Sequence, residues 1–139
     1  MNTRTKKWLL SYAVTAGIFA VLDLVWITFV ASTLYQSQIG HLMAPRPNAA
    51  GAVAFYIVFV AGMVHYGVPP LDADASVRQR VIGAGLFGFF AYATWALTAF
   101  AVLKDFTLLV AVTDISWGAG ACSFVTWLTA SILRRVLAQ

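Results

Sequence analysis

Four long apolar stretches occupy most of the sequence and constrain its fold more than any other feature. They run approximately over residues 8–31, 50–68, 81–103 and 108–131 of the 139 positions. An α-helix needs about 20 mostly apolar residues to cross the roughly 30 Å hydrocarbon core of a bilayer. Lipid offers no hydrogen-bond partners, and the alternation typical of a membrane β-barrel is absent. We therefore predict an all-α membrane protein, a compact bundle of four transmembrane helices forming one domain over residues 1–139.

The composition supports a membrane location and excludes several classes of protein. Apolar residues make up 61% of the chain and charged residues only 10%, compared with about 25% charged residues in soluble domains. This excludes a soluble enzyme, a disordered regulator and a disulfide-stapled secreted module. The first stretch contains Asp23 and Trp26 and is longer than the 7 to 15 residues of a signal-peptide core. We therefore expect it to be retained as a helix.

The cations are distributed unequally between the two faces of such a bundle. The face with both termini and the loop 69–80 carries seven cations: Arg4, Lys6, Lys7, Arg78, Arg80, Arg134 and Arg135. The other face carries Arg46 and Lys104. Because cytoplasmic loops are enriched in Lys and Arg, this asymmetry predicts that both termini are cytoplasmic. Topology and anionic lipid headgroups account for the basic charge, so we expect no nucleic-acid partner.

Two carboxylates lie inside the predicted spans. Asp23 and Asp114 each precede a tryptophan by three residues, Trp26 and Trp117 respectively. A carboxylate within a membrane is costly unless it is paired, hydrated or protonated. At about 1.5 Å per residue, Asp23 lies roughly 12 Å and Asp114 roughly 9 Å below the outer ends of their spans. We therefore expect both acids in one polar layer in the outer half, with Tyr56, Thr98 and Trp95 near it.

The connection over residues 32–48 is long, and part of it keeps helical spacing. We predict that this part lies flat in the membrane interface. Pro45 and Pro47 stiffen its end and could lower Arg46 to pair with Asp23 or Asp114. The alternative is that Arg46 binds lipid phosphates.

Glycines within the spans predict close helix contacts. Gly83, Gly85 and Gly88 match a dinucleotide-binding pattern, but they lie inside an apolar span where that motif has no strand-to-helix turn. We interpret them, with Gly118 and Gly120, as small residues that let a neighbouring helix approach. The neighbour could also belong to a membrane-protein partner or a second copy of the chain.

The remaining candidate ligands do not form a recognisable metal or cofactor site. His41 and His65 have no local partner at a metal-binding spacing, and Cys122 is the lone cysteine. Pro69, Pro70, Asp72 and Asp74 are predicted to form a cytoplasmic turn. We therefore predict neither a metal nor a cofactor.

Four segments of the chain resemble a known family. Residues 23–26, 40–48 (GHLMAPRPN), 90–94 (FAYAT) and 114–118 (DISWG) are similar to the bacterial family of predicted membrane proteins called domain of unknown function 2177. The resemblance covers nearly the whole chain, and the Ala-Pro-Arg-Pro-Asn segment is its most specific part. It implies a compact four-helix protein of the bacterial inner membrane.

The chain departs from the family pattern in its third span. After Ala-Thr the family usually has an aromatic residue followed by Asp-Leu-Thr-Asn, whereas this chain has Trp95, Ala96, Leu97, Thr98 and Ala99. A third acid that the resemblance would add to the polar layer is therefore missing, and Ala96 and Ala99 replace usual polar residues. If that acid carries the activity of the family, the activity is expected to be lost or altered in this chain.

Three functions remain open at the level of sequence. The first is a polar and aromatic site in the outer half that binds or moves a small molecule, a lipid headgroup or a proton. The second is an accessory or structural subunit of a membrane complex, and the third is a lipid-modifying membrane enzyme, for which no nucleophile-base pair is evident. No catalytic residue is assigned. The candidate binding residues are Asp23, Asp114, Arg46, Trp26, Trp117, Trp95, Tyr92, Tyr56, Thr98 and Asn48.

Overall fold

The computed structural model describes residues 1–67, 75–137 and 139, and this part of the chain contains helices and no strand. The elements are α1 (Thr3–Trp26), a π-helical turn (Ile27–Ala31), α2 (Ser32–Ile39), a 3-10 turn (Gly40–Leu42), α3 (Ala49–Gly67), α4 (Val77–Val102) and α5 (Leu108–Leu137). Four helical segments, Thr3–Leu42, α3, α4 and α5, are long and apolar enough to cross a membrane. The four predicted spans are confirmed. Residue 68 and the predicted turn at Pro69, Pro70, Asp72 and Asp74 lie outside the described residues.

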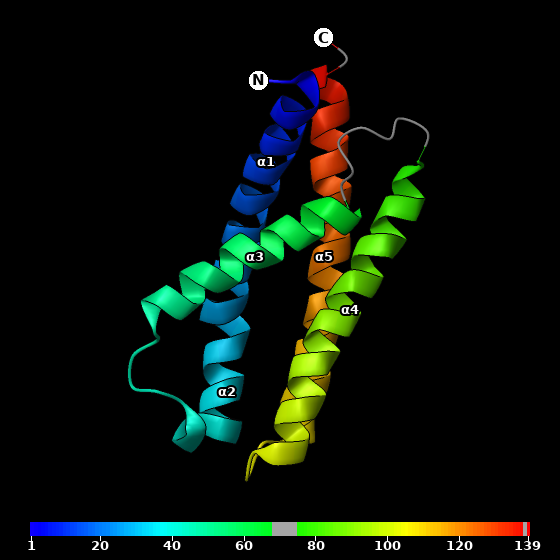
Figure 1. Ribbon diagram of the computed structural model, residues 1–139. Helices are drawn as coiled ribbons and strands as arrows, with labels where there is room; N and C mark the ends of the chain where they lie inside the picture. Colours follow the sequence, from blue (N-terminus) through cyan, green and yellow to red (C-terminus); the bar gives the residue numbers. More distant parts are fainter. Residues whose placement is uncertain (68–74, 138) are drawn as a thin grey trace.

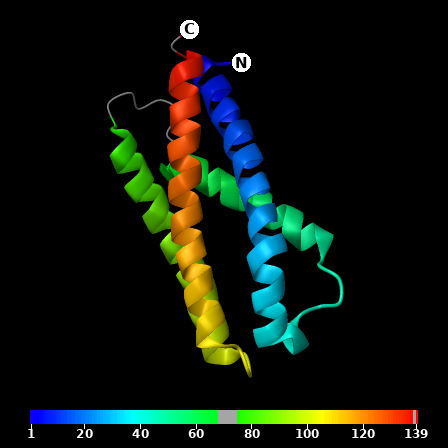
Figure 2. The same cartoon turned by 180° about the vertical axis from the view of Figure 1, so that it is seen from behind.

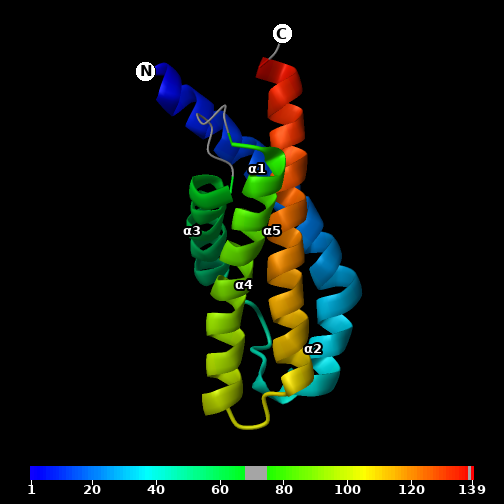
Figure 3. The same cartoon turned by 90° about the vertical axis from the view of Figure 1, so that its right-hand side faces the viewer.

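The first helix continues well beyond the predicted end of its span. The π-helical turn joins α1 directly to α2, and the backbone N–H of Ser32 donates to the carbonyl of Ile27. Residues 32–39 therefore extend the first helix instead of lying flat in the interface, and that prediction is wrong. Figure 3 shows that the long helix bends along its course, as helices often do at a π-helical turn.

Each long helix begins at a polar side chain that caps its free backbone N–H groups. Asn2 accepts from Arg4 N–H at 3.1 Å in α1, and Asn48 accepts from Gly51 N–H at 3.1 Å in α3. Ser76 and Gln79 form a reciprocal capping box at the start of α4, and Thr107 accepts from Val110 N–H at 3.3 Å in α5. These short local signals place the helix starts, because a cap satisfies donors that have no partner in the first turn.

Helix α5 is the central element of the bundle. It contacts α1, α2, α3 and α4, and more of its residues are buried than those of any other helix. Helix α5 returns antiparallel along α4 after a short turn, and α1 lies on the other side of α5 (Figures 1 and 2). Both termini lie at one end of the bundle, which we call the terminal end; residues 40–48 and 103–107 form the opposite end.

Glycines permit the close approach of α4 and α5, as predicted. A Cβ at Gly88 would collide with the carbonyl oxygen of Gly118 and lie 2.7 Å from Cys122 Sγ, and a Cβ at Gly118 would collide with the ring of Tyr92. Gly120 differs, because a Cβ there would meet nothing within 4 Å. Gly88 and Gly118 thus pack against the neighbouring helix inside the molecule.

Helix α3 crosses the bundle obliquely and covers only part of it (Figure 1). Its second half packs into the core through Phe59, Val60, Met63 and Val64. In its first half, over residues 49–58, every residue is exposed except the partly buried Tyr56. The molecule also exposes many large apolar side chains on its other helices. This apolar exterior is what contact with a lipid bilayer requires.

Candidate functional site

Two contacts between α1 and α5 show which residues of the two helices lie at the same level along the bundle. The Trp26 and Trp117 rings stack with their centroids 4.3 Å apart and their planes at 10°. Nearer the terminal end, the hydroxyls of Thr15 and Thr129 lie 3.4 Å apart. Because the helices run antiparallel, Asp23 lies one turn from the tryptophan pair toward the terminal end, and Asp114 lies one turn from it toward the opposite end.

The two acids therefore do not share one layer, contrary to the sequence-based expectation. At a rise of about 1.5 Å per residue, they are separated by roughly 9 Å along the bundle, with the stacked tryptophans between their levels. The expectation was wrong because it placed the outer end of the first helix at residue 31. The helix continues to Ile39, so Asp23 lies farther from the opposite end than Asp114 does.

Asp23 forms a hydrogen-bonded link between α1 and α3. Its side chain is 6% exposed, and the hydroxyl of Tyr56 donates to its Oδ2. The indole N–H of Trp117 is buried close to Asp23 but completes no hydrogen bond with it. A second link lies beside the first, because the Tyr12 hydroxyl donates to the Ile57 carbonyl at 2.9 Å. Asp23 and Tyr56 thus hold α3 against the long first helix.

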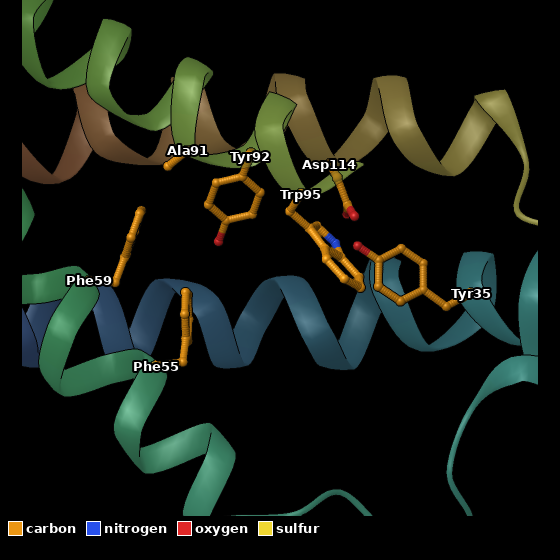
Figure 4. A pocket seen from close by; sticks show the side chains of 7 residues that line it. All are labelled: Tyr35, Phe55, Phe59, Ala91, Tyr92, Trp95 and Asp114. Atoms are coloured by element: carbon orange, nitrogen blue, oxygen red, sulfur yellow. The ribbon is translucent and has the colours of Figure 1, made fainter. Parts of the chain in front are cut away.

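Asp114 lies in a different environment, at the wall of a pocket. The pocket has a volume of about 510 Å³, within the range of roughly 300–1,000 Å³ typical of small-molecule sites. Its lining residues come from α2, α3, α4 and α5 (Figure 4): Tyr35, Phe55, Phe59, Ala91, Tyr92, Trp95 and Asp114. We call it the Asp114 pocket. Five of its seven lining residues are aromatic, and Asp114 is its one charged residue.

The Asp114 carboxylate has no partner in the described part of the chain. Its residue is 5% exposed, yet no described side chain or backbone group forms a hydrogen bond or an ion pair with it. The Tyr35 hydroxyl points toward the carboxylate, and the Trp95 ring lies beside them (Figure 4). A buried carboxylate without a partner among the described residues is costly unless it is hydrated or protonated.

Three predicted site residues contact neither Asp23 nor the Asp114 pocket. Arg46 is exposed and forms no ion pair with Asp23 or Asp114, so the predicted pairing is wrong. Asn48 is exposed and caps α3. Thr98 is exposed on α4 and does not line the Asp114 pocket. Proline-stiffened residues 43–48 connect the opposite end of the first helix to α3, which keeps Arg46 away from the buried acids.

Ala96 and Ala99, the positions that depart from the family pattern, are both buried in an apolar cluster. They pack with Ile39, Val110 and Ala111 near the opposite end. Neither residue lines the Asp114 pocket. An acid at position 96 would therefore be buried among these apolar side chains, against which Tyr35 of the pocket also packs.

Sequence reasoning missed four residues that line the pocket: Tyr35, Phe55, Phe59 and Ala91. Tyr35 was assigned to a connecting segment, although its helical spacing with neighbouring apolar residues was visible in the sequence. Phe55 and Phe59 lie one helical turn apart and so share a face. They face the pocket only because α3 crosses the bundle obliquely, which no local pattern encodes.

The fold and this site define a class: a four-helix membrane protein in which a buried acid, without a partner in the described part of the chain, lines an aromatic pocket. A family model described as predicted membrane protein (DUF2177) matches residues 8–131. The chain belongs to this family, as the resemblance of its four segments predicted. No curated protein and no solved structure shows a significant match to the chain.

Proposed function

We propose that the protein binds a small molecule in the Asp114 pocket, within the inner membrane of a bacterium. The observation that carries the proposal is Asp114, a residue that is 5% exposed, lines a pocket of about 510 Å³ and has no partner for its carboxylate among the described residues. Pockets of this size with a mainly apolar lining and few polar groups are the usual form of a ligand site. The polar group then orients the ligand, and the aromatic walls supply most of the contact area.

The orientation that we propose places both termini in the cytoplasm, in keeping with the excess of cations at the terminal end. The Asp114 pocket then lies in the outer half of the membrane. It is open at its rim, because Trp95 is 57% exposed and Phe55 is 41% exposed. These residues come from α4 and α3, on surfaces that lipid would cover, so a ligand would reach the pocket from the bilayer.

Native mass spectrometry of the protein released from nanodiscs that contain the host lipids tests the proposal. We expect the wild-type chain to retain a small-molecule adduct that Asp114→Asn and Trp95→Ala both lose. Trp127→Ala is the matched control, because Trp127 is 49% exposed and does not line the Asp114 pocket. A wild-type chain without an adduct, or an adduct that survives both pocket substitutions, would contradict the proposal.

An accessory role is a second candidate, and the first half of α3 favours it. Residues 49–58 form an exposed apolar half-helix, and hydrogen bonds at Tyr56 and its neighbour Ile57 link it to α1. A partner helix could pack against this segment through van der Waals contact, as helices do in membranes. The same mass spectra distinguish the two candidates. An accessory subunit would be released with a stoichiometric protein partner, and Asp114→Asn would not change the binding of that partner.

A further inference from the structure

The charge balance of the Asp114 pocket limits the ligands that it can accept. Among the described residues, the lining of the pocket contains one carboxylate and no Lys, Arg or His. An anionic ligand would add a second negative charge with no cation to offset it. A carboxylate away from water is stabilised by a cation or by protonation. Of the ligand classes, only a cation would be attracted by the negative charge of Asp114.

The walls of the pocket favour an organic cation over a metal ion. The rings of Tyr35 and Trp95 lie beside the carboxylate, and the rings of Phe55, Phe59 and Tyr92 line the rest of the pocket (Figure 4). Faces of aromatic rings attract ammonium groups, tryptophan most strongly, and the attraction grows when water is excluded. A hard metal ion would need several oxygen ligands, whereas an ammonium group with carbon substituents can use the ring faces directly.

The open rim indicates that the ligand also has an apolar part. Trp95 and Phe55 are both substantially exposed, on surfaces that lipid would cover in the proposed orientation. A hydrocarbon tail can leave the pocket past these two residues without losing contact with an apolar environment. In contrast, a small hydrophilic cation would have to cross lipid to enter.

We infer that the Asp114 pocket binds an amphiphilic organic ammonium compound, with its cationic head between Asp114 and Trp95 and its tail in the lipid. The inference rests on the proposed function of this pocket and adds the chemical class of the ligand. Asp23 offers no equivalent site, because Tyr56 already donates to it and it does not line the Asp114 pocket.

Three probes with the same six-carbon chain test the inference: hexyltrimethylammonium, hexan-1-ol and hexanoate. The quaternary ammonium is charged at every pH, so its own titration does not affect the result. Binding is measured by saturation-transfer NMR on the probe protons, with the full chain in uncharged dodecyl maltoside micelles. The variants are Asp114→Asn and Trp95→Ala, with Trp127→Ala as the matched control.

We expect hexyltrimethylammonium to bind saturably to the wild-type chain and more tightly than hexan-1-ol or hexanoate. Asp114→Asn should weaken its binding at least about tenfold, because loss of one partner of a desolvated charge pair is expensive. Binding of hexan-1-ol should be nearly unchanged in this variant, which also shows that the pocket is still folded. Trp95→Ala should weaken both probes, whereas Trp127→Ala should weaken neither.

Any one of three results would overturn the inference. If hexan-1-ol or hexanoate binds the wild-type chain as tightly as the ammonium, or if Asp114→Asn leaves ammonium binding unchanged, the ligand class is wrong. If no probe binds saturably, the ligand class is also wrong. In each case an Asp114-dependent adduct in the native mass spectra would still support the pocket as a binding site, so the two proposals fail separately.

Discussion

Asp23 and Asp114 occur in the same local pattern, yet their side chains have different surroundings. Each precedes a tryptophan by one helical turn, and the two tryptophans stack on each other. Asp23 accepts a hydrogen bond from Tyr56, whereas Asp114 has no partner among the described residues. The difference comes from α3, which brings a phenol to one acid and phenyl rings to the pocket of the other. We therefore expect substitutions of the two acids to have different effects.

Loss of the Tyr56 hydroxyl should destabilise the fold. Tyr56→Phe leaves the Asp23 carboxylate buried without its donor, and we expect a loss of about 1–3 kcal/mol in the free energy of unfolding. Asp23→Asn should cost less, because an amide oxygen can still accept from the phenol. Thermal unfolding in detergent, followed by circular dichroism, measures both effects.

Tyr66→Phe is the matched control for this comparison. Tyr66 lies in the same helix but is 64% exposed, so its hydroxyl should contribute little to stability. Equal melting temperatures for Tyr56→Phe and Tyr66→Phe would show that the link between Asp23 and Tyr56 does not hold α3 in place.

At the scale of the element, the π-helical turn decides where the second part of the first helix points. A π turn accommodates one residue more than an α turn. Here the backbone N–H of Ser32 donates to the carbonyl of Ile27, five residues earlier. Without this turn, every residue of α2 would be rotated about the helix axis relative to α1. The π-helical turn thereby helps to direct Tyr35 at the Asp114 pocket while Asp23 remains beside α3.

Deletion of one residue within this turn should be better tolerated than a deletion in regular α-helix. Removal of Phe29, which is 75% exposed, should convert the turn to α-helix and keep the faces of the flanking segments. Removal of Val21, which is 65% exposed, should rotate all following residues by about 100°, since an α-helix has 3.6 residues per turn. We expect the Val21 deletion to have the lower melting temperature and to lose probe binding. The reverse order would contradict this role of the turn.

The contact between α4 and α5 should depend on Gly88 and not on Gly120. A Cβ at position 88 would collide with the carbonyl of Gly118, and overpacking of this kind typically costs about 1–3 kcal/mol. A Cβ at position 120 would meet nothing within 4 Å. We expect Gly88→Ala to lower the melting temperature by several degrees and Gly120→Ala to change it little. Similar effects of both substitutions would mean that the helices are not in close contact at Gly88.

At the scale of the whole molecule, the distribution of cations predicts the topology in a bacterial inner membrane. Both termini lie at one end (Figure 1), as an even number of spans requires, and this end is predicted to be cytoplasmic. Alkaline phosphatase, which is active only outside the cytoplasm, should be active when fused after Lys104. It should be inactive when fused after Ser76 or Gln139, where green fluorescent protein should fluoresce. Phosphatase activity at Gln139 would refute the predicted orientation.

Much of the fold could be predicted because lipid makes strong local demands on a sequence. Each span must be apolar and helical over its own length, so the stretches at 50–68, 81–103 and 108–131 lie close to the observed helices α3, α4 and α5. The first span was less well predicted. Its polar residues from Ser32 onward resemble a connection, although the structure continues them as helix.

The candidate site was predictable only in part. Asp114, Trp95 and Tyr92 could be selected from the sequence, because an acid within a membrane span and nearby aromatic residues are local features. The pairing of Tyr56 with Asp23 and the positions of Phe55 and Phe59 could not. They depend on the oblique path of α3, which results from packing against three other helices.

The sequence by itself determined the number of spans, their helical nature, the family and the presence of two intramembrane acids. Each follows from residue types and spacing along one segment. Only the tertiary structure decided that Asp23 accepts a hydrogen bond from Tyr56 and that Arg46 stays away from both acids. It also decided that Asp114 lines an aromatic pocket with no partner among the described residues. The physical reason is that burial and hydrogen bonding depend on neighbouring helices, and a small change in the end or tilt of one helix changes which side chains meet.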